Sequence, residues 1–162
     1  MKYSPLFLVF LFIINAGCTA QQTKPSLDTE QLIEDLRVIS SDEMEGRRTG
    51  TEEGAKPFQG SFTHSFDFTS RGGEERSGIN VIGQIEGESD SVLVITAHYD
   101  HLGMEDSLIY NGADDDASGT AALLAYIDYF NQVKPNHTLV FAAFDAEEMG
   151  LQGARALVKD SV

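Results

Sequence analysis

The sequence of 162 residues predicts a three-layer α/β domain, in which a sheet is covered by helices on both faces. Two continuous apolar runs, residues 92–97 and 138–144, have the composition and length of buried strands. Between them, residues 121–126 form an apolar stretch that favours a helix. A strand, a helix and a second strand in this order are typical of a mixed α/β domain.

The other elements are predicted by local patterns. Residues 28–31 can cap a helix. Residues 61–68 alternate between polar and aromatic side chains, which predicts a strand with an exposed polar face. Asp116 or Ser118 can begin the helix that contains residues 121–126, and residues 150–158 predict a last helix against the sheet. The first helix carries an apolar stripe that we expect to face the core: Leu32, Ile33, Leu36 and Ile39.

Polar side chains follow each of the two apolar strands. His98 and Asp100 come at the end of the first, and Glu147 and Glu148 just after the second. Open α/β sheets bind ligands in the crevice outside the carboxyl ends of their strands, so we expect the two groups to meet. His98 and Asp100 point to the same side of an extended chain, which suits a metal-binding imidazole oriented by a carboxylate. Glu147 and Glu148 point apart, which suits one carboxylate that binds metal and one that moves protons.

Three consecutive aspartates, Asp114, Asp115 and Asp116, precede the central helix. Adjacent carboxylates repel one another and destabilise a compact state unless a bound cation reverses the interaction. Each of the three polar segments, at residues 98–101, 114–116 and 147–148, could by itself be a solvated loop. The occurrence of all three segments in one chain favours a metal site.

In order and spacing, these segments resemble the dizinc aminopeptidase family of bacterial leucyl aminopeptidase, to which glutamate carboxypeptidase and glutaminyl cyclase are related. The matching segments are residues 97–100, 112–119 and 145–153, with further landmarks at residues 39–47 and 78–83. The resemblance implies a zinc-exopeptidase-like α/β fold for residues 28–162, which would be the N-terminal part of a zinc peptidase domain.

The resemblance also implies two zinc ions and a role for each site residue. His98 would bind one zinc, Asp115 would bridge the two ions, and Glu148 would bind the second. Asp100 would orient His98, and Glu147 would be the general base. In the family, the peptide bond after the bridging aspartate is often cis, so the resemblance implies a cis bond here as well.

The sequence departs from the family in two places. Family members supply a further Asp and a further His ligand beyond the Glu-Glu motif, and these are not found in the 162 residues. His64 and His137 lie in contexts unlike the missing ligand, whereas His101 is close enough to line the pocket and could complete one site. A long helix precedes the aromatic strand in relatives, but residues 50–58 lead directly into it. We therefore expect a truncated protein, incomplete at the C-terminus, that neither holds a stable zinc pair nor cleaves peptides as it stands.

The N-terminus predicts export. A lysine precedes an apolar run over residues 6–14, far shorter than the ~20 residues that span a bilayer, so residues 1–17 are interpreted as a signal peptide. Cys18 follows small residues, as in a bacterial lipoprotein signal, and would be lipidated, with residues 18–27 as a tether. The protein would then be a membrane lipoprotein facing the periplasm. Asn15 is unusual for such a signal, so a secreted protein with an incidental cysteine is the alternative.

Charge and motifs leave three functions open. The net charge of −15 argues against a nucleic-acid partner, because phosphates would be repelled. The first function is a zinc-dependent aminopeptidase acting on peptide substrates. The second is a glutaminyl-cyclase-like enzyme, which would need only one zinc. The third is an inactive protein anchored to the bacterial membrane that has kept the fold.

Overall fold

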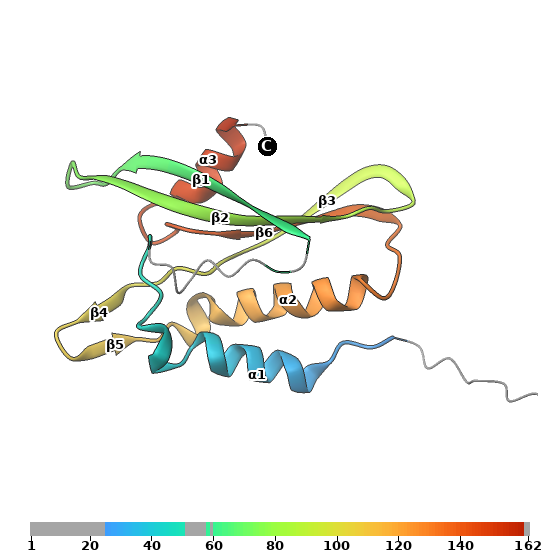
Figure 1. Cartoon of the computed structure of the whole chain (residues 1–162), viewed down its shortest axis with the longest axis horizontal. Coiled ribbons are helices and arrows are strands. Elements are labelled where there is room, and N and C mark those ends of the chain that lie inside the picture. Colours follow the sequence, from blue (N-terminus) through green and yellow to red (C-terminus); the bar gives the residue numbers. More distant parts are fainter. Residues whose placement is uncertain (1–24, 51–57, 59, 161–162) are drawn as a thin grey trace, which may run out of the picture.

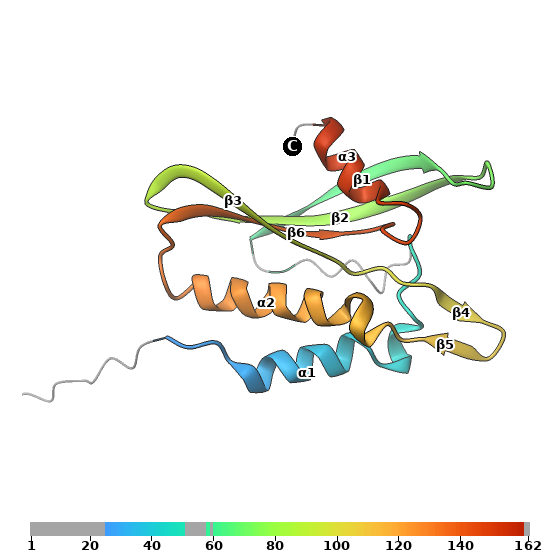
Figure 2. The same ribbon diagram turned by 180° about the vertical axis from the view of Figure 1, so that it is seen from behind.

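The computed structural model describes residues 25–50, 58 and 60–160. A four-stranded sheet has helices α1 and α2 on one face and α3 on the other, as Figure 1 and the reverse view in Figure 2 show. The predicted three-layer α/β fold is thereby confirmed. The elements are α1 (Thr29–Ile39), η1 (Asp42–Met44), β1 (Ser61–Thr69), β2 (Glu75–Ile85), β3 (Ser89–His98), β4 (Gly103–Glu105), β5 (Leu108–Tyr110), η2 (Ala113–Ala117), α2 (Ser118–Phe130), β6 (His137–Phe144) and α3 (Gln152–Asp160).

The sheet is mixed, with the strand order β1-β2-β6-β3. β2 pairs with β1 and β6 in antiparallel fashion, whereas β3 and β6 are parallel. The register places His98 opposite Phe144, so β3 and β6 end side by side. The chain between them forms the β4–β5 hairpin, then η2 and then α2.

The strand predicted at residues 92–97 exists, but the prediction that it is buried is wrong. Val92, Leu93 and Val94 are 59%, 51% and 54% exposed. The reason is the position of β3 at the edge of the sheet, where only β6 pairs with it among the described strands. β6 has a similar composition and lies between two strands, and its Phe141 is completely buried.

Apolar side chains pack on both faces of the sheet. One core lies between α2 and the sheet and another between β1 and the segment that leads into α3. The first contains Ala97, Leu123, Ile127, Leu139 and Phe141, and the second contains Phe66, Phe68 and Ala146. These cores hold β3, β6 and α2 in fixed positions, and the ends of these elements carry the polar groups.

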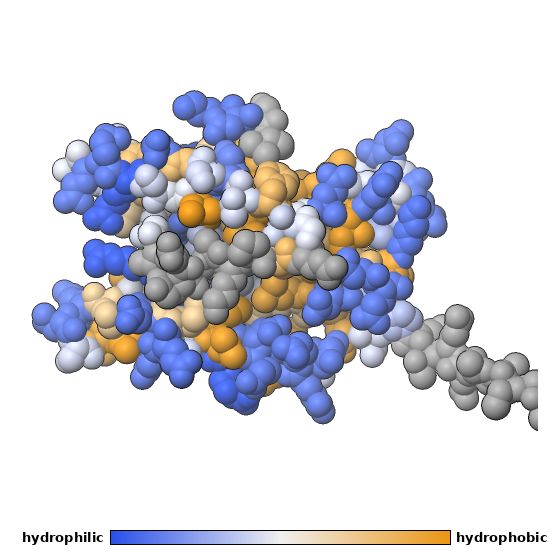
Figure 3. All heavy atoms as spheres, viewed as in Figure 1, coloured by the Kyte–Doolittle hydropathy of each residue, from blue (hydrophilic) through white to orange (hydrophobic). Residues whose placement is uncertain are grey.

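Helix α1 begins as predicted, but its apolar stripe is not part of the core. The Asp28 carboxylate accepts the backbone N–H groups of Glu30 at 3.1 Å and Gln31 at 3.0 Å, which caps the helix. No residue of α1 is buried, and Ile33 is half exposed. α1 rests on α2 at the outside of the molecule rather than on the sheet (Figure 1). Hydrophilic side chains line the lower edge of the space-filling view, where α1 lies (Figure 3).

Ser118 and Asp116 were the two predicted starts of the central helix, and each has a part in it. Ser118 is the first residue of α2, and the Asp116 carboxylate accepts the N–H of Gly119 in the first turn. α3 begins at Gln152, two residues later than predicted. The signal peptide, Cys18 and residues 51–57 lie outside the described residues. Within the described part of the chain, every helix is too short or too polar to cross a membrane.

Candidate metal centre

The parallel pairing of β3 and β6 brings two polar segments together. Beyond the last paired residues, the Tyr99 N–H donates to the Phe144 carbonyl at 3.0 Å, which keeps the two chains adjacent as they leave the sheet. His98 is the last residue of β3, and the segments that follow contain Asp100 and His101 on one side and Glu147 and Glu148 on the other. The two groups therefore meet beyond the carboxyl ends of β3 and β6, as the sequence predicts.

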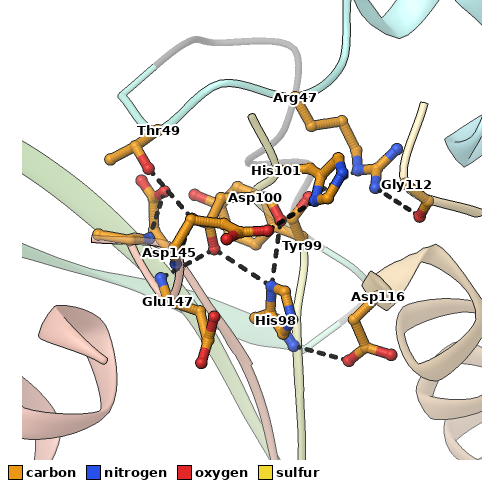
Figure 4. A network of polar contacts seen from close by, with 12 residues as sticks. Arg47, Thr49, His98, Tyr99, Asp100, His101, Gly112, Asp116, Asp145 and Glu147 are labelled. Atoms are coloured by element: carbon orange, nitrogen blue, oxygen red, sulfur yellow. Dashed lines mark hydrogen bonds and ion pairs between the residues drawn. The ribbon is translucent and has the colours of Figure 1, made fainter. Parts of the chain in front are cut away.

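The ring of His98 contacts the carboxylates of Asp100 and Asp115, and Figure 4 shows the ring beside Asp100. Its Nδ1 is 3.1 Å from the Asp100 carbonyl oxygen and 3.5 Å from the Asp100 carboxylate, and its Nε2 is 3.0 Å from Asp115 Oδ1. Burial opposes a charge on the ring, but the hydrogen bond to Asp100 and the charges of Asp100 and Asp116 outweigh it and raise the pKa of His98 to about 9. The contacts on its two nitrogens orient the ring between Asp100 and Asp115.

Asp100 is fully buried and holds the Glu-Glu segment through its backbone. Its carboxylate accepts the N–H groups of Glu147 at 3.0 Å and Glu148 at 3.3 Å, and the hydroxyl of Thr49 at 3.1 Å. Asp100 thus contacts His98 and positions both glutamates at the same time. The sequence predicted the first of these contacts but not the second.

The three consecutive aspartates differ in their environments. Asp114 and Asp115 are exposed, and Asp115 has 68% of its side chain open to solvent. Asp116 points inward, where its carboxylate accepts the N–H groups of His98 at 3.2 Å and Gly119 at 3.0 Å. The peptide bond between Asp115 and Asp116 is cis, as the resemblance implied.

The two glutamates also differ. Glu148 Oε1 is 2.7 Å from His101 Nδ1, and these atoms lie with a carboxylate oxygen of Asp115 in a group whose members are all within 4.8 Å of one another. Glu147 is not part of this group among the described residues, and its side chain extends away from Asp100 (Figure 4). Imidazole nitrogen and carboxylate oxygen are common zinc ligands, so these residues fit the metal that the resemblance implies.

His101 thus lies in the site, whereas the other two histidines do not. His64 is held between Asn80 at 3.2 Å and Asp160 at 3.1 Å, away from the acidic groups. His137 lies at the start of β6, at the opposite end of that strand from the Glu-Glu segment, and contacts Ser89.

A buried arginine joins the segments that carry the site. The guanidinium of Arg47 donates to the carbonyls of Tyr99, Ile39 and Asn111 at 2.7 Å each, and of Gly112 at 3.0 Å. Burial lowers the pKa of Arg47, and the charges of Asp100 and Asp116 oppose that effect. The sequence identified Arg47 only as part of a landmark, because the carbonyls that it binds are distant in the chain.

Comparison with known proteins is consistent with this geometry. The model of peptidase family M28 matches residues 80–162, which include all the acidic groups of the site. Leucine aminopeptidase 1 of Chaetomium globosum is 40% identical over 86 residues, which cover 48% of this chain and 21% of that protein. A vacuolar membrane protease of Laccaria bicolor is 37% identical over 111 residues, which cover 61% of this chain and 10% of that protein.

Solved structures share the fold. A glutaminyl cyclase from an Acidobacteriales bacterium superposes with a TM-score of 0.71 at 21% identity, covering 87% of this chain and 55% of that one. A Zn-dependent exopeptidase from Parabacteroides distasonis gives a TM-score of 0.62 at 21% identity, covering 79% of this chain and 50% of that one. The chain thus spans about half the length of these structures and a smaller share of the curated relatives. Because the family model matches just over half of its residues, and does so across the acidic site, this chain belongs to peptidase family M28.

Proposed function

We propose that this protein is a zinc-dependent aminopeptidase that removes N-terminal residues from peptides. The observation that carries the proposal is the position of Asp115 between the ends of two parallel strands. Its carboxylate is 3.0 Å from His98, the last residue of β3, and it also groups with Glu148, which follows β6. These three residues lie inside the segment that matches peptidase family M28. The names of relatives such as leucine aminopeptidase 1 support the same reaction.

In this proposal, His98, Asp115 and Glu148 hold zinc. When bound, zinc polarises the scissile carbonyl and activates a water molecule. When the ring is neutral, its Nδ1–H donates to the Asp100 carbonyl and the lone pair of Nε2 lies on the side of Asp115. Because the pKa of His98 is raised to about 9, zinc has to displace the Nε2 proton in order to bind there. Asp115 and Glu148 supply two negative charges that offset those of a divalent cation.

Glu147 is the proposed general base. Its backbone is fixed by the hydrogen bond to Asp100, and its carboxylate is directed away from that residue. A carboxylate oxygen of Glu147 can accept a proton from the attacking water and return it to the amino group that leaves. Because Glu147 lies outside the cluster of metal donors, its removal is expected to affect proton transfer more than metal binding.

The test separates these two roles in the natural protein loaded with zinc. Glu147→Gln is expected to lower kcat on amino-acid p-nitroanilides by about 100-fold or more while zinc content is retained, which is the scale of general-base catalysis. Glu148→Gln is expected to lower zinc content instead. Equal loss of zinc in both variants, or full activity in Glu147→Gln, would show that the roles are wrongly assigned.

The same preparation distinguishes the cyclase alternative. A peptide with an N-terminal glutamine is incubated with the wild-type protein, and the products are identified by mass spectrometry. An aminopeptidase releases free amino acids. Formation of pyroglutamyl peptide with loss of ammonia, without hydrolysis of any p-nitroanilide, would replace the proposed function with that of a glutaminyl cyclase.

We also propose that the protein is exported and anchored in a bacterial membrane through lipidated Cys18. Support comes from the apolar run followed by small residues and this cysteine, which is the only one in the sequence. Cys18→Ala is expected to move the protein from the membrane fraction to the soluble periplasm, whereas Ser26→Ala, in the tether, should leave it in the membrane fraction. Unchanged membrane association of Cys18→Ala would contradict the anchor.

A further inference from the structure

We propose that His101 binds the same metal ion as Glu148, so that His101, Glu148 and Asp115 form a site with three protein donors. The inference rests on the proposed function and extends it, because the residues assigned above give that ion only Glu148 and the shared Asp115. It also changes the expectation from the sequence, in which His101 was only one way to complete a site.

The geometry of the donor atoms supports a shared ion. His101 Nδ1 lies 2.7 Å from Glu148 Oε1, and one donor atom from each of His101, Glu148 and Asp115 lies within 4.8 Å of the other two. Donors at about 2 Å from a tetrahedral zinc are roughly 3.3 Å apart. The three side chains therefore lie close enough to share one ion, with the His101–Glu148 hydrogen bond opening to admit it.

The backbone of His101 is held firmly enough to place a ligand. Its N–H donates to the Arg47 carbonyl at 2.9 Å, and it forms a parallel β-bridge with Arg48. Arg47 is itself fixed through its buried guanidinium. This pairing directs the His101 side chain toward the edge where β3 and β6 end, although His101 lies beyond the last residue of β3.

The ring of His101 is also fixed. Its side chain is 12% exposed, and it lies against Gly112, where a Cβ atom would collide with the ring. Gly112 has a φ of +51°, a conformation that glycine adopts at no steric cost. The loop before the three aspartates thus leaves room for an imidazole directed at Glu148.

The arrangement gives each exposed carboxylate its own histidine. His98 Nε2 contacts Asp115 at 3.0 Å, and His101 Nδ1 contacts Glu148 at 2.7 Å. His98 ends β3 and His101 lies three residues further along the chain, and the two histidines differ in the nitrogen that they present.

A hydrogen bond alone could also explain the contact between His101 and Glu148, and two substitutions separate the cases. His101→Gln keeps an amide donor that can reach Glu148, but glutamine is a poor zinc ligand. His101→Ala removes both functions. His137→Gln is the matched control, since His137 is exposed at the far end of β6.

Zinc affinity is measured for the full chain by competition with a chelator, and folding is followed by circular dichroism. If His101 is a ligand, both His101 variants are expected to lose more than about 100-fold in affinity, beyond the 10–100-fold typical of residues that only orient a ligand. His137→Gln should bind zinc like the wild type. Wild-type affinity in His101→Gln would overturn the inference while leaving the proposed function intact.

X-ray absorption at the zinc edge gives a second readout that does not depend on a His101 variant folding. In zinc-loaded His98→Ala, an imidazole signal is expected to persist, because His101 still binds. The loss of all imidazole scattering would show that His101 is not a ligand. Failure of the wild-type protein to bind zinc at all would overturn the proposed function together with the inference.

Discussion

Asp115 and Asp116 are neighbours in the chain, yet they belong to two regions of the site with opposite properties. Asp115 and Glu148, the outer carboxylates, are open to solvent over 68% and 22% of their side chains and face histidine rings. Asp100, Asp116 and Asp145, the inner carboxylates, accept backbone N–H groups, and two of them are at most 1% exposed. The inner carboxylates are thus stabilised by backbone N–H groups, whereas the outer ones contact side chains.

The inner carboxylates organise the backbone on which the outer ones are carried. Asp145 shows the balance most clearly, since burial raises its pKa whereas the N–H groups of Ile79 and Ala146 oppose that shift. Backbone donors partly replace water around such a group. The outer carboxylates contact histidine side chains instead, so a bound cation would replace a side-chain contact and leave the backbone donors in place.

The largest expected effect comes from removing an outer carboxylate. Asp115→Ala should lower zinc affinity by more than about 100-fold, beyond the range for residues that only orient ligands. The free energy of unfolding of the metal-free protein should change by no more than about 0.5 kcal/mol, because the side chain is mostly exposed. Zinc titration and urea unfolding measure the two quantities.

Asp114→Ala is the control for this experiment, since Asp114 is also exposed and carries the same charge one position earlier. It should retain zinc affinity within about tenfold, because its loss changes only the surrounding charge. If Asp114→Ala and Asp115→Ala weaken zinc binding equally, the effect is one of net charge, and Asp115 is not a specific ligand.

The sequence predicted where several strands and helices lie better than it predicted how deeply each is buried. Residues 92–97 and 138–144 both have the apolar composition of strands, and both form strands. Only the second is buried, because burial depends on the neighbouring strands and not on the composition of the strand itself. β2 was not predicted at all as a strand, although part of it was noted as a landmark, because glycine and polar residues interrupt its apolar pattern.

The same distinction holds for the site. Strand ends and a run of like charges are local features, and they pointed to His98 and to the two acidic groups. The resemblance then implied which carboxylates bind metal, namely Asp115 and Glu148. The position of His101 beside Glu148 depends on a β-bridge between His101 and Arg48. Arg47 holds the segments of the site together by donating to carbonyl groups as far away as Gly112. Contacts of this kind join segments that are distant in the chain. The sequence could therefore place His101 near the pocket, but it could not show that His101 contacts Glu148.

The smaller expected effect comes from an inner carboxylate, Asp116, and it concerns stability rather than zinc. Asn keeps an oxygen for the N–H of Gly119 at the start of α2, and asparagine is a good helix cap. It loses the charge and one of the two acceptors, so the N–H of His98 loses its partner. Asp116→Asn is therefore expected to reduce the free energy of unfolding by about 1 kcal/mol, and Asp116→Ala, which loses both bonds, by about 2 kcal/mol.

Urea unfolding of both metal-free variants gives these values, and zinc titration should show less than a tenfold change in affinity for Asp116→Asn. A loss of affinity in Asp116→Asn as large as in Asp115→Ala would remove the distinction between inner and outer carboxylates, because it would mean that Asp116 also binds the metal.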